Sequence, residues 1–233
     1  MPIAWGAKLE GHVFDLQDWR EIFAAPFDPR VDLVPHPAGE MSVLRGSAFD
    51  NVAGGEEAMA RAIPLIEQMN GAALLSRQCR PVSFVAAVSI DGDQVALHHF
   101  VQLQGLEARL RGSVIGLAMG PEGQSIPPPA PVSSEAQNWI GIAANNDDIA
   151  DLLSHVSKAT SWYDLYKAIE LVERIAGGAH EMEGRLGDGY FNWRLAKSTA
   201  NFYRHARAYR PPHPMDLPNA KDLLISVAHE ILR

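Results

Sequence analysis

The chain contains a single cysteine, Cys79, among its 233 residues. One cysteine cannot form an intramolecular disulfide and cannot by itself supply a thiolate zinc site, so a reducing cytoplasm is the expected compartment. The first residues, MPIAWGAKLEGHVFDLQDW, lack a basic segment followed by an apolar one. No window approaches the roughly 18 apolar residues of a membrane span. We therefore predict a cytoplasmic protein without a membrane partner.

An excess of basic residues is also absent. The 20 lysines and arginines are outnumbered by 28 acidic residues, which gives a net charge of −8. Binding along a nucleic acid depends mainly on neutralising phosphates, so this balance argues against a general nucleic-acid coat. Any anion site must therefore be local. The hydrophobic content of 47% is enough for a packed core.

The usual cofactor motifs are missing as well. There is no phosphate-binding loop ending in Gly-Lys-Ser/Thr, no dinucleotide glycine motif and no Gly-x-Ser-x-Gly elbow. The stretch HEME from His180 to Glu183 lacks the second histidine of a zincin helix. His98 and His99 are neighbours on a predicted strand, where successive side chains point to opposite faces. We therefore expect no cofactor and no metal site.

The clearest break in composition is the proline-rich stretch 119–137, MGPEGQSIPPPAPVSSEAQ. Proline excludes helix and central strand, so this stretch is predicted to be a linker, with a proline-rich docking ligand as the alternative. It divides the chain into a first domain, 1–118, and a second domain, 138–233.

The first domain is predicted to be α+β. The segments MSVLR, PVSFVAAVSI, QVALHHFVQL and ARLRGSVIGLAM are strand candidates, and Asp91-Gly92 is a strong hairpin signal. The segment GEEAMARAIPLIEQMNG is typical of a helix that ends at Asn70-Gly71 and that Pro64 kinks or splits. We expect an antiparallel meander with one main helix.

The second domain is predicted to be an all-α bundle of four or five helices. Its segments carry apolar residues at spacings of three and four. Ser161 with Asp164 makes a capping-box-like start, Gly177-Gly178 a stop, and Asp216 an N-cap for the last helix. The aromatic residues of this half that share helical spacing are expected in the core: Trp162, Tyr163 and Tyr166.

Two pairs of acids resemble carboxylate dyads or magnesium ligands. They are Asp15 with Asp18, and Asp147 with Asp148. Both pairs stand where helices are expected to begin, and helix N-termini favour aspartate through capping and the macrodipole. The structural role is therefore the favoured interpretation.

Cys79 lies between Arg77 and Arg80. These two cations are expected to lower the pKa of its thiol, yet a nucleophile also needs a placed base, and the sequence does not identify one.

A basic helix precedes the turn RPPHP. Between Asp188 and Asp216 the chain has five lysines and arginines and no acid. On a helical wheel the stripe of Leu195, Thr199, Phe202, Ala206 and Tyr209 is expected in the core, with Trp193, Ala196, Ala200 and Tyr203 extending it. The opposite sector is polar, and we predict that it binds an anion through Arg194, Lys197, Asn201, Arg204 and His205.

A structural interpretation competes with this prediction. Cations late in a helix interact favourably with its C-terminal dipole. Arg207 lies on the wheel beside the small residues Ala196 and Ala200, where it is expected to cap carbonyls, pair with an acid or turn into a cleft. His213 stands between prolines and is equally consistent with an exposed turn residue.

An arginine near a helix end, then four to six residues of which the first is usually polar, then a histidine and an apolar helix, resembles the signature of the HEPN superfamily of small helical bundles. Here Arg204-His205 has the polar pair of that signature, but His213 follows too late; Arg207 has the right spacing to His213, but Ala208 replaces the polar residue. The resemblance implies a metal-independent ribonuclease that dimerises. Its histidine would help proton transfer at the ribose 2′-hydroxyl while its arginine holds the phosphate.

The resemblance covers at most residues 161–233, and the whole layout is similar to that of uncharacterised two-domain bacterial proteins. We predict a non-catalytic binding or assembly module of a cytoplasmic bacterial protein. The alternative is an HEPN-like ribonuclease whose catalytic residues are Arg204, Arg207 and His213. The partners expected are RNA or another anionic ligand at the basic helix, a protein partner, or a second copy of the chain in a homodimer.

Overall fold

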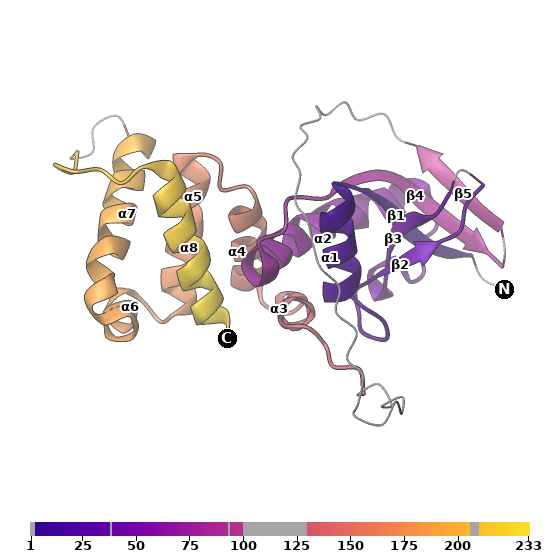
Figure 1. Ribbon diagram of the computed structural model, residues 1–233, viewed down its shortest axis with the longest axis horizontal. Coiled ribbons are helices and arrows are strands. Elements are labelled where there is room, and N and C mark those ends of the chain that lie inside the picture. The colour runs from indigo at the N-terminus through magenta and orange to yellow at the C-terminus, as the bar shows by residue number, and fades with distance from the viewer. Residues whose placement is uncertain (1–2, 38, 93, 100–129, 206–209) are drawn as a thin grey trace, which may run out of the picture.

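A computed structural model of the chain (Figure 1) describes residues 3–37, 39–92, 94–99, 130–205 and 210–233. It combines a five-stranded sheet in the N-terminal half with helices that dominate the C-terminal half, which confirms the predicted α+β class. The strands are β1 Ala4–Glu10, β2 Arg30–Val34, β3 Met41–Arg45, β4 Ser83–Asp91 and β5 Gln94–His99. The helices are α1 Val13–Ile22, α2 Gly55–Arg77, α3 Glu135–Ala143, α4 Asp147–Ser157, α5 Trp162–Ile175, α6 Ala179–Leu186, α7 Tyr190–Arg204 and α8 Leu217–Leu232, with the 3-10 turns η1 Ser47–Phe49 and η2 Gly187–Gly189.

The sheet has the order β2-β3-β1-β4-β5, and every neighbouring pair is antiparallel. The β4–β5 hairpin confirms the Asp91-Gly92 signal, with Gly92 at a positive φ of 59°. The central strand β1 was missed, because AWGAKLE contains no β-branched residue. A Cβ on its Gly6 would lie 2.6 Å from the carbonyl oxygen of Leu44, so this strand needs a glycine to approach β3. The candidate strand 108–119 lies outside the described residues.

Helix α2 is longer than predicted. It runs without interruption through Pro64 and past Asn70-Gly71 to Arg77, so Pro64 does not split it and the expected stop is wrong. Gln78 ends it in the left-handed conformation, at a φ of 54°, and its N–H bonds the carbonyls of the last turn.

Tertiary contacts explain why Asn70-Gly71 lies inside this helix. The buried Asn70 side chain accepts from the N–H of Val82 at 2.7 Å and donates to the carbonyl of Val82 at 2.8 Å, which attaches α2 to the chain entering β4. A Cβ on Gly71 would lie 1.9 Å from the carbonyl oxygen of Leu153 in α4. The dipeptide therefore serves a strand entry and a helix crossing rather than a turn.

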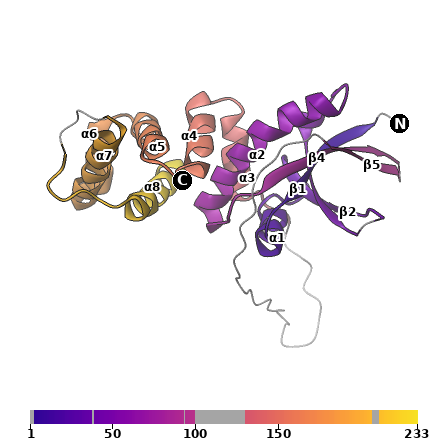
Figure 2. The same ribbon diagram turned by 90° about the horizontal axis from the view of Figure 1, so that it is seen from above.

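Helix α2 lies between the sheet and the C-terminal helices (Figures 1 and 2), in contact with β1 and β4 and also with α3 and α4. One hydrophobic cluster includes Ala7 of the sheet, Trp19 of α1, Met69 of α2, Leu153 of α4 and Leu224 of α8. The two halves of the chain therefore share one core. Burial of this apolar surface is the main stabilising contribution.

Most of the predicted linker lies outside the described residues, so the division into 1–118 and 138–233 stays a prediction. Its described end enters α3 through a capping box formed by Ser134 and Gln137. The Gln137 side-chain amide also donates to the carbonyls of Ala24 and Pro29, at 3.0 and 3.1 Å. These bonds hold the start of α3 against the N-terminal half.

Three helix signals of the second half are confirmed, but its described residues form six α-helices rather than four or five, because α6 was not predicted. Ser161 caps α5 by accepting from the N–H of Asp164 at 3.2 Å, and Asp216 caps α8 by accepting from the N–H of Asn219 at 2.8 Å. Gly177 and Gly178 follow α5 with positive φ. Along the described stretches, no helix combines the length and the apolar character needed to cross a membrane.

Candidate functional site

The predicted basic helix is α7, which packs against α5. Its buried residues are Trp193, Ala196, Thr199 and Ala200. The expected core stripe is therefore rotated: Leu195 and Phe202 are half-buried and Tyr203 is 48% exposed, while Ala206 and Tyr209 lie outside the described residues. Apart from Trp193, the buried face of α7 carries small side chains, and Tyr203 near its end faces solvent.

Helix α5 supplies the carboxylates that the sequence of α7 lacks. Glu173, which is buried, accepts a hydrogen bond from Trp193 Nε1 at 3.1 Å and pairs with Lys197 Nζ. Glu170 Oε2 lies 3.7 Å from a terminal nitrogen of Arg204. Two of the predicted anion ligands, Lys197 and Arg204, are therefore ion-paired within the bundle.

Arg204 also lies over two tyrosines of α5. Its guanidinium carbon is 4.3 Å from the ring centroid of Tyr166 and 5.9 Å from that of Tyr163. Cation–π attraction and the nearby Glu170 hold the guanidinium against this face. Burial raises the pKa of the Tyr166 hydroxyl, and the Glu170 carboxylate raises it further, so Tyr166 keeps its proton at neutral pH.

Aromatic side chains extend this face toward solvent. Trp162 and Tyr203 are stacked, with ring centroids 5.1 Å apart and planes inclined by 13°. Tyr163 is 55% exposed, and the guanidinium carbon of Arg210 lies 5.8 Å from the ring centroid of Phe202. We name this group the aromatic–arginine surface; its members are Trp162, Tyr163, Tyr166, Phe202, Tyr203, Arg204 and Arg210. It lies where α5 begins and α7 ends (Figure 1).

The expectation that the three aromatic residues of α5 lie in the core holds only in part, since Trp162 and Tyr166 pack against the edge of the core and Tyr163 does not. Trp162 and Tyr166 are half-buried and Tyr163 is exposed. The fully buried apolar residues of α5 are aliphatic, namely Leu165, Ala168, Ile169, Leu171 and Val172. Helical spacing alone fits both faces, so the sequence contained no signal that separates them.

The other predicted site residues are dispersed around the end of α7. Arg194 and His205 are exposed and Asn201 is half-buried. Within the described ranges, Arg194 and Arg210 have no carboxylate at ion-pair distance. His213 is exposed in the turn before α8. Arg207 lies outside the described residues, so its pairing with His213 stays a prediction.

The pKa expectation for Cys79 is wrong in sign. Burial raises the pKa of its thiol to about 12, and the neighbouring carboxylates of Asp18 and Asp15 raise it as well, which outweighs the lowering by Arg77. Arg77 is occupied by Glu21, 2.7 Å away. The thiol is therefore protonated at neutral pH and unsuited to nucleophilic catalysis.

Slow alkylation of Cys79 is the expected consequence. With a pKa of about 12, roughly one thiol in 10⁴ is ionised at pH 8, against about one in four for an ordinary cysteine. Iodoacetamide should modify the native protein at least about 100-fold more slowly than the urea-unfolded protein, as followed by mass spectrometry. Equal rates in the two states would contradict the buried, protonated thiol.

Comparison with protein-family models, with curated proteins and with solved structures gave no match. The resemblance to HEPN domains therefore stays a prediction, and the geometry of the aromatic–arginine surface is the basis for a functional proposal.

Proposed function

We propose that the helical half is a non-catalytic binding module whose aromatic–arginine surface binds single-stranded RNA. The observation that carries this proposal is the clustering of exposed or half-exposed aromatic rings with arginines at one end of the bundle. Unpaired bases stack on such rings and on guanidinium planes, and single-stranded RNA offers its bases in this form.

The rings on this surface are held in place rather than free. The stacking of Trp162 on Tyr203 and the contact of Arg204 with Tyr166 restrict the side chains before any ligand binds. Restriction of this kind lowers the entropy lost on binding. Tyr163 and Tyr203, which are 55% and 48% exposed, are the rings available for a base.

Charge supports an anionic ligand at this end. From residue 189 to residue 215 the chain carries five lysines and arginines and no acid. Lys197 and Arg204 are paired with carboxylates of α5, so Arg194 and Arg210 are the described cations that remain available for phosphates. The net charge of −8 keeps the contact local, so we expect a short footprint.

Binding is measured by fluorescence anisotropy with a labelled single-stranded oligoribonucleotide at low salt. Replacing Tyr163 or Tyr203 by alanine should raise the Kd by about five- to 150-fold, because one stacked base contributes about 1–3 kcal/mol. The matched control is Phe191→Ala: Phe191 is 73% exposed on the same helix but lies at its other end. Its Kd should equal that of the unmodified protein.

The electrostatic contribution is tested separately. Arg210→Gln should lower the slope of log Kd against log salt by about one, whereas the exposed Arg185→Gln on α6 should leave it unchanged. No binding by the unmodified protein at low salt, or an equal loss in Phe191→Ala, would refute the proposal.

The same RNA, recovered and separated by length, tests the ribonuclease alternative. RNA fragments that form with the unmodified protein but not with His213→Ala would favour HEPN-like catalysis over simple binding. Intact RNA in both samples fits the binding module.

A further inference from the structure

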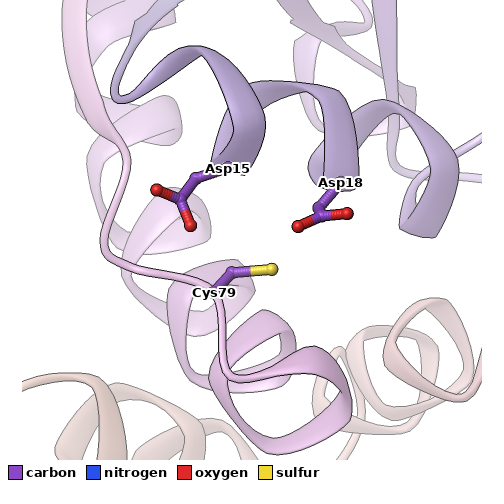
Figure 3. A group of neighbouring side chains, drawn as sticks. All are labelled: Asp15, Asp18 and Cys79. Carbon is purple, nitrogen blue, oxygen red and sulfur yellow. The ribbon is translucent and has the colours of Figure 1, made fainter. Parts of the chain in front are cut away.

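Three potential metal ligands converge where α1 meets the end of α2 (Figure 3). Asp15 and Asp18 lie on one face of α1, and Cys79 follows Gln78, which ends α2. A carboxylate oxygen of each aspartate and the Cys79 sulfur all lie within 4.8 Å of one another. Figure 3 shows both carboxylates turned toward the space beside the thiol. The aspartates are three residues apart, so helical geometry places them on the same side.

Asp15 provides a second, independent observation. Its side chain is only 8% exposed, and one oxygen, Oδ1, accepts from the backbone N–H of Arg80 at 3.0 Å. The other oxygen, Oδ2, is buried and accepts no hydrogen bond from any described residue. The Nε of Arg80 forms an ion pair with it at 3.7 Å, which is too long for a hydrogen bond. A buried carboxylate oxygen without a hydrogen-bond donor is rare in proteins, so this oxygen has a lone pair left for a metal ion even beside the Arg80 guanidinium.

The neighbouring cation does not fully engage Asp18. Arg77, which lies 3.6 Å from Asp18, is paired more closely with Glu21 at 2.7 Å, so Asp18 is not its principal partner. The Asp18 side chain is 43% exposed, so solvent reaches this member of the group, while Asp15 and Cys79 are buried.

The donor set selects the kind of ion. Magnesium and calcium prefer oxygen ligands alone, whereas zinc and similar ions accept thiolate sulfur together with carboxylate oxygen. We propose that Asp15, Asp18 and Cys79 bind one zinc-type divalent ion, with water in the fourth position. The thiol releases its proton to solvent as the sulfur coordinates the ion. Ligands around tetrahedral zinc lie about 3.3–3.5 Å apart, so the ligand atoms, which lie within 4.8 Å of one another, must approach by up to about 1.5 Å.

Cobalt(II) is the probe for this site, because a cobalt–thiolate bond has a strong charge-transfer absorption in the near ultraviolet. Cys79 is the one cysteine of the chain, so a thiolate band identifies it, whereas the nine histidines could bind a metal without producing that band. Titration of the full chain under reducing conditions should produce the band with one cobalt per chain. Excess zinc should abolish it.

Variants establish the ligands. Cys79→Ser should remove the band. Asp15→Asn and Asp18→Asn should each raise the cobalt Kd at least about tenfold, because each variant loses one of the three ligands. Asp147→Asn, at the exposed start of α4, is the matched control and should bind as the unmodified protein does. Circular dichroism checks that each variant is folded. Because Asp18 is half-exposed, its variant keeps the test decisive if Asp15→Asn does not fold.

Absence of the band at millimolar cobalt would overturn the proposal. So would a band of equal strength in Cys79→Ser, or cobalt affinity in Asp15→Asn and Asp18→Asn that equals the affinity of the Asp147→Asn control.

Discussion

Replacing Gly71 by alanine is expected to lower the free energy of unfolding by about 2–4 kcal/mol. In an isolated helix this change would stabilise by about 1 kcal/mol, because alanine is the better helix former. Here the new Cβ would lie 1.9 Å from the carbonyl oxygen of Leu153, a backbone atom that no side-chain rotation can move away. Helices α2 and α4 must separate along their shared core, and that cost exceeds the gain in helix propensity.

Chemical denaturation measures the free energy of unfolding and thermal denaturation measures the melting temperature, both monitored by far-ultraviolet circular dichroism. The melting temperature of Gly71→Ala should fall by roughly 4–16 °C, given about 2–4 °C per kcal/mol for a chain of this size. The matched control is Gly141→Ala in α3, where an added Cβ meets nothing within 4 Å. That variant should gain about 0.5–1 kcal/mol. A stabilised Gly71→Ala would show that α2 and α4 do not cross closely at this point.

Replacing Asn70 by alanine should lower the free energy of unfolding by about 2–4 kcal/mol. The substitution removes both hydrogen bonds to Val82 and leaves a buried N–H and a buried carbonyl without partners. Each unsatisfied group costs about 1–3 kcal/mol, while the better helix propensity of alanine returns less than about 0.7 kcal/mol. The loss should appear as a lower denaturation midpoint with an unchanged slope.

Asn192→Ala is the control for this effect. Asn192 is also helical but exposed, so its replacement should change the stability by less than about 0.5 kcal/mol. Hydrogen exchange adds a local readout, since the amide of Val82 should exchange faster in Asn70→Ala than in the unmodified protein. Equal stabilities of the Asn70 and Asn192 variants would indicate that water replaces both hydrogen bonds.

The end of α7 shows how far sequence reasoning reached into the candidate site. The sequence shows a run of cations without acids along this segment. It does not show that Glu170 and Glu173 on α5 pair with two of these cations. Those pairings join residues more than twenty positions apart, and no local pattern encodes them. For the same reason, periodicity could not decide that Tyr163 faces solvent while Leu165 faces the core.

The Asp15, Asp18 and Cys79 group shows the same limit. The sequence favoured helix capping for the two aspartates, but the N-cap of α1 is His12 and no side chain caps this helix. Cys79 lies more than sixty residues later in the chain. Only the packing of α1 against the end of α2 brings the thiol to the carboxylates and reverses the expected direction of its pKa.

By itself, the sequence determined the α+β class, the hairpin at Asp91-Gly92 and the caps at Ser161 and Asp216, because turns and caps depend on residues within a few positions of one another. The tertiary structure decided that α2 continues through Asn70-Gly71 and which face of α7 is buried. The local stop signal is overridden because Asn70 forms hydrogen bonds with Val82 before β4 and Gly71 lets α4 pack closely against α2. Burial and hydrogen bonding at these residues outweigh helix propensities below about 1 kcal/mol.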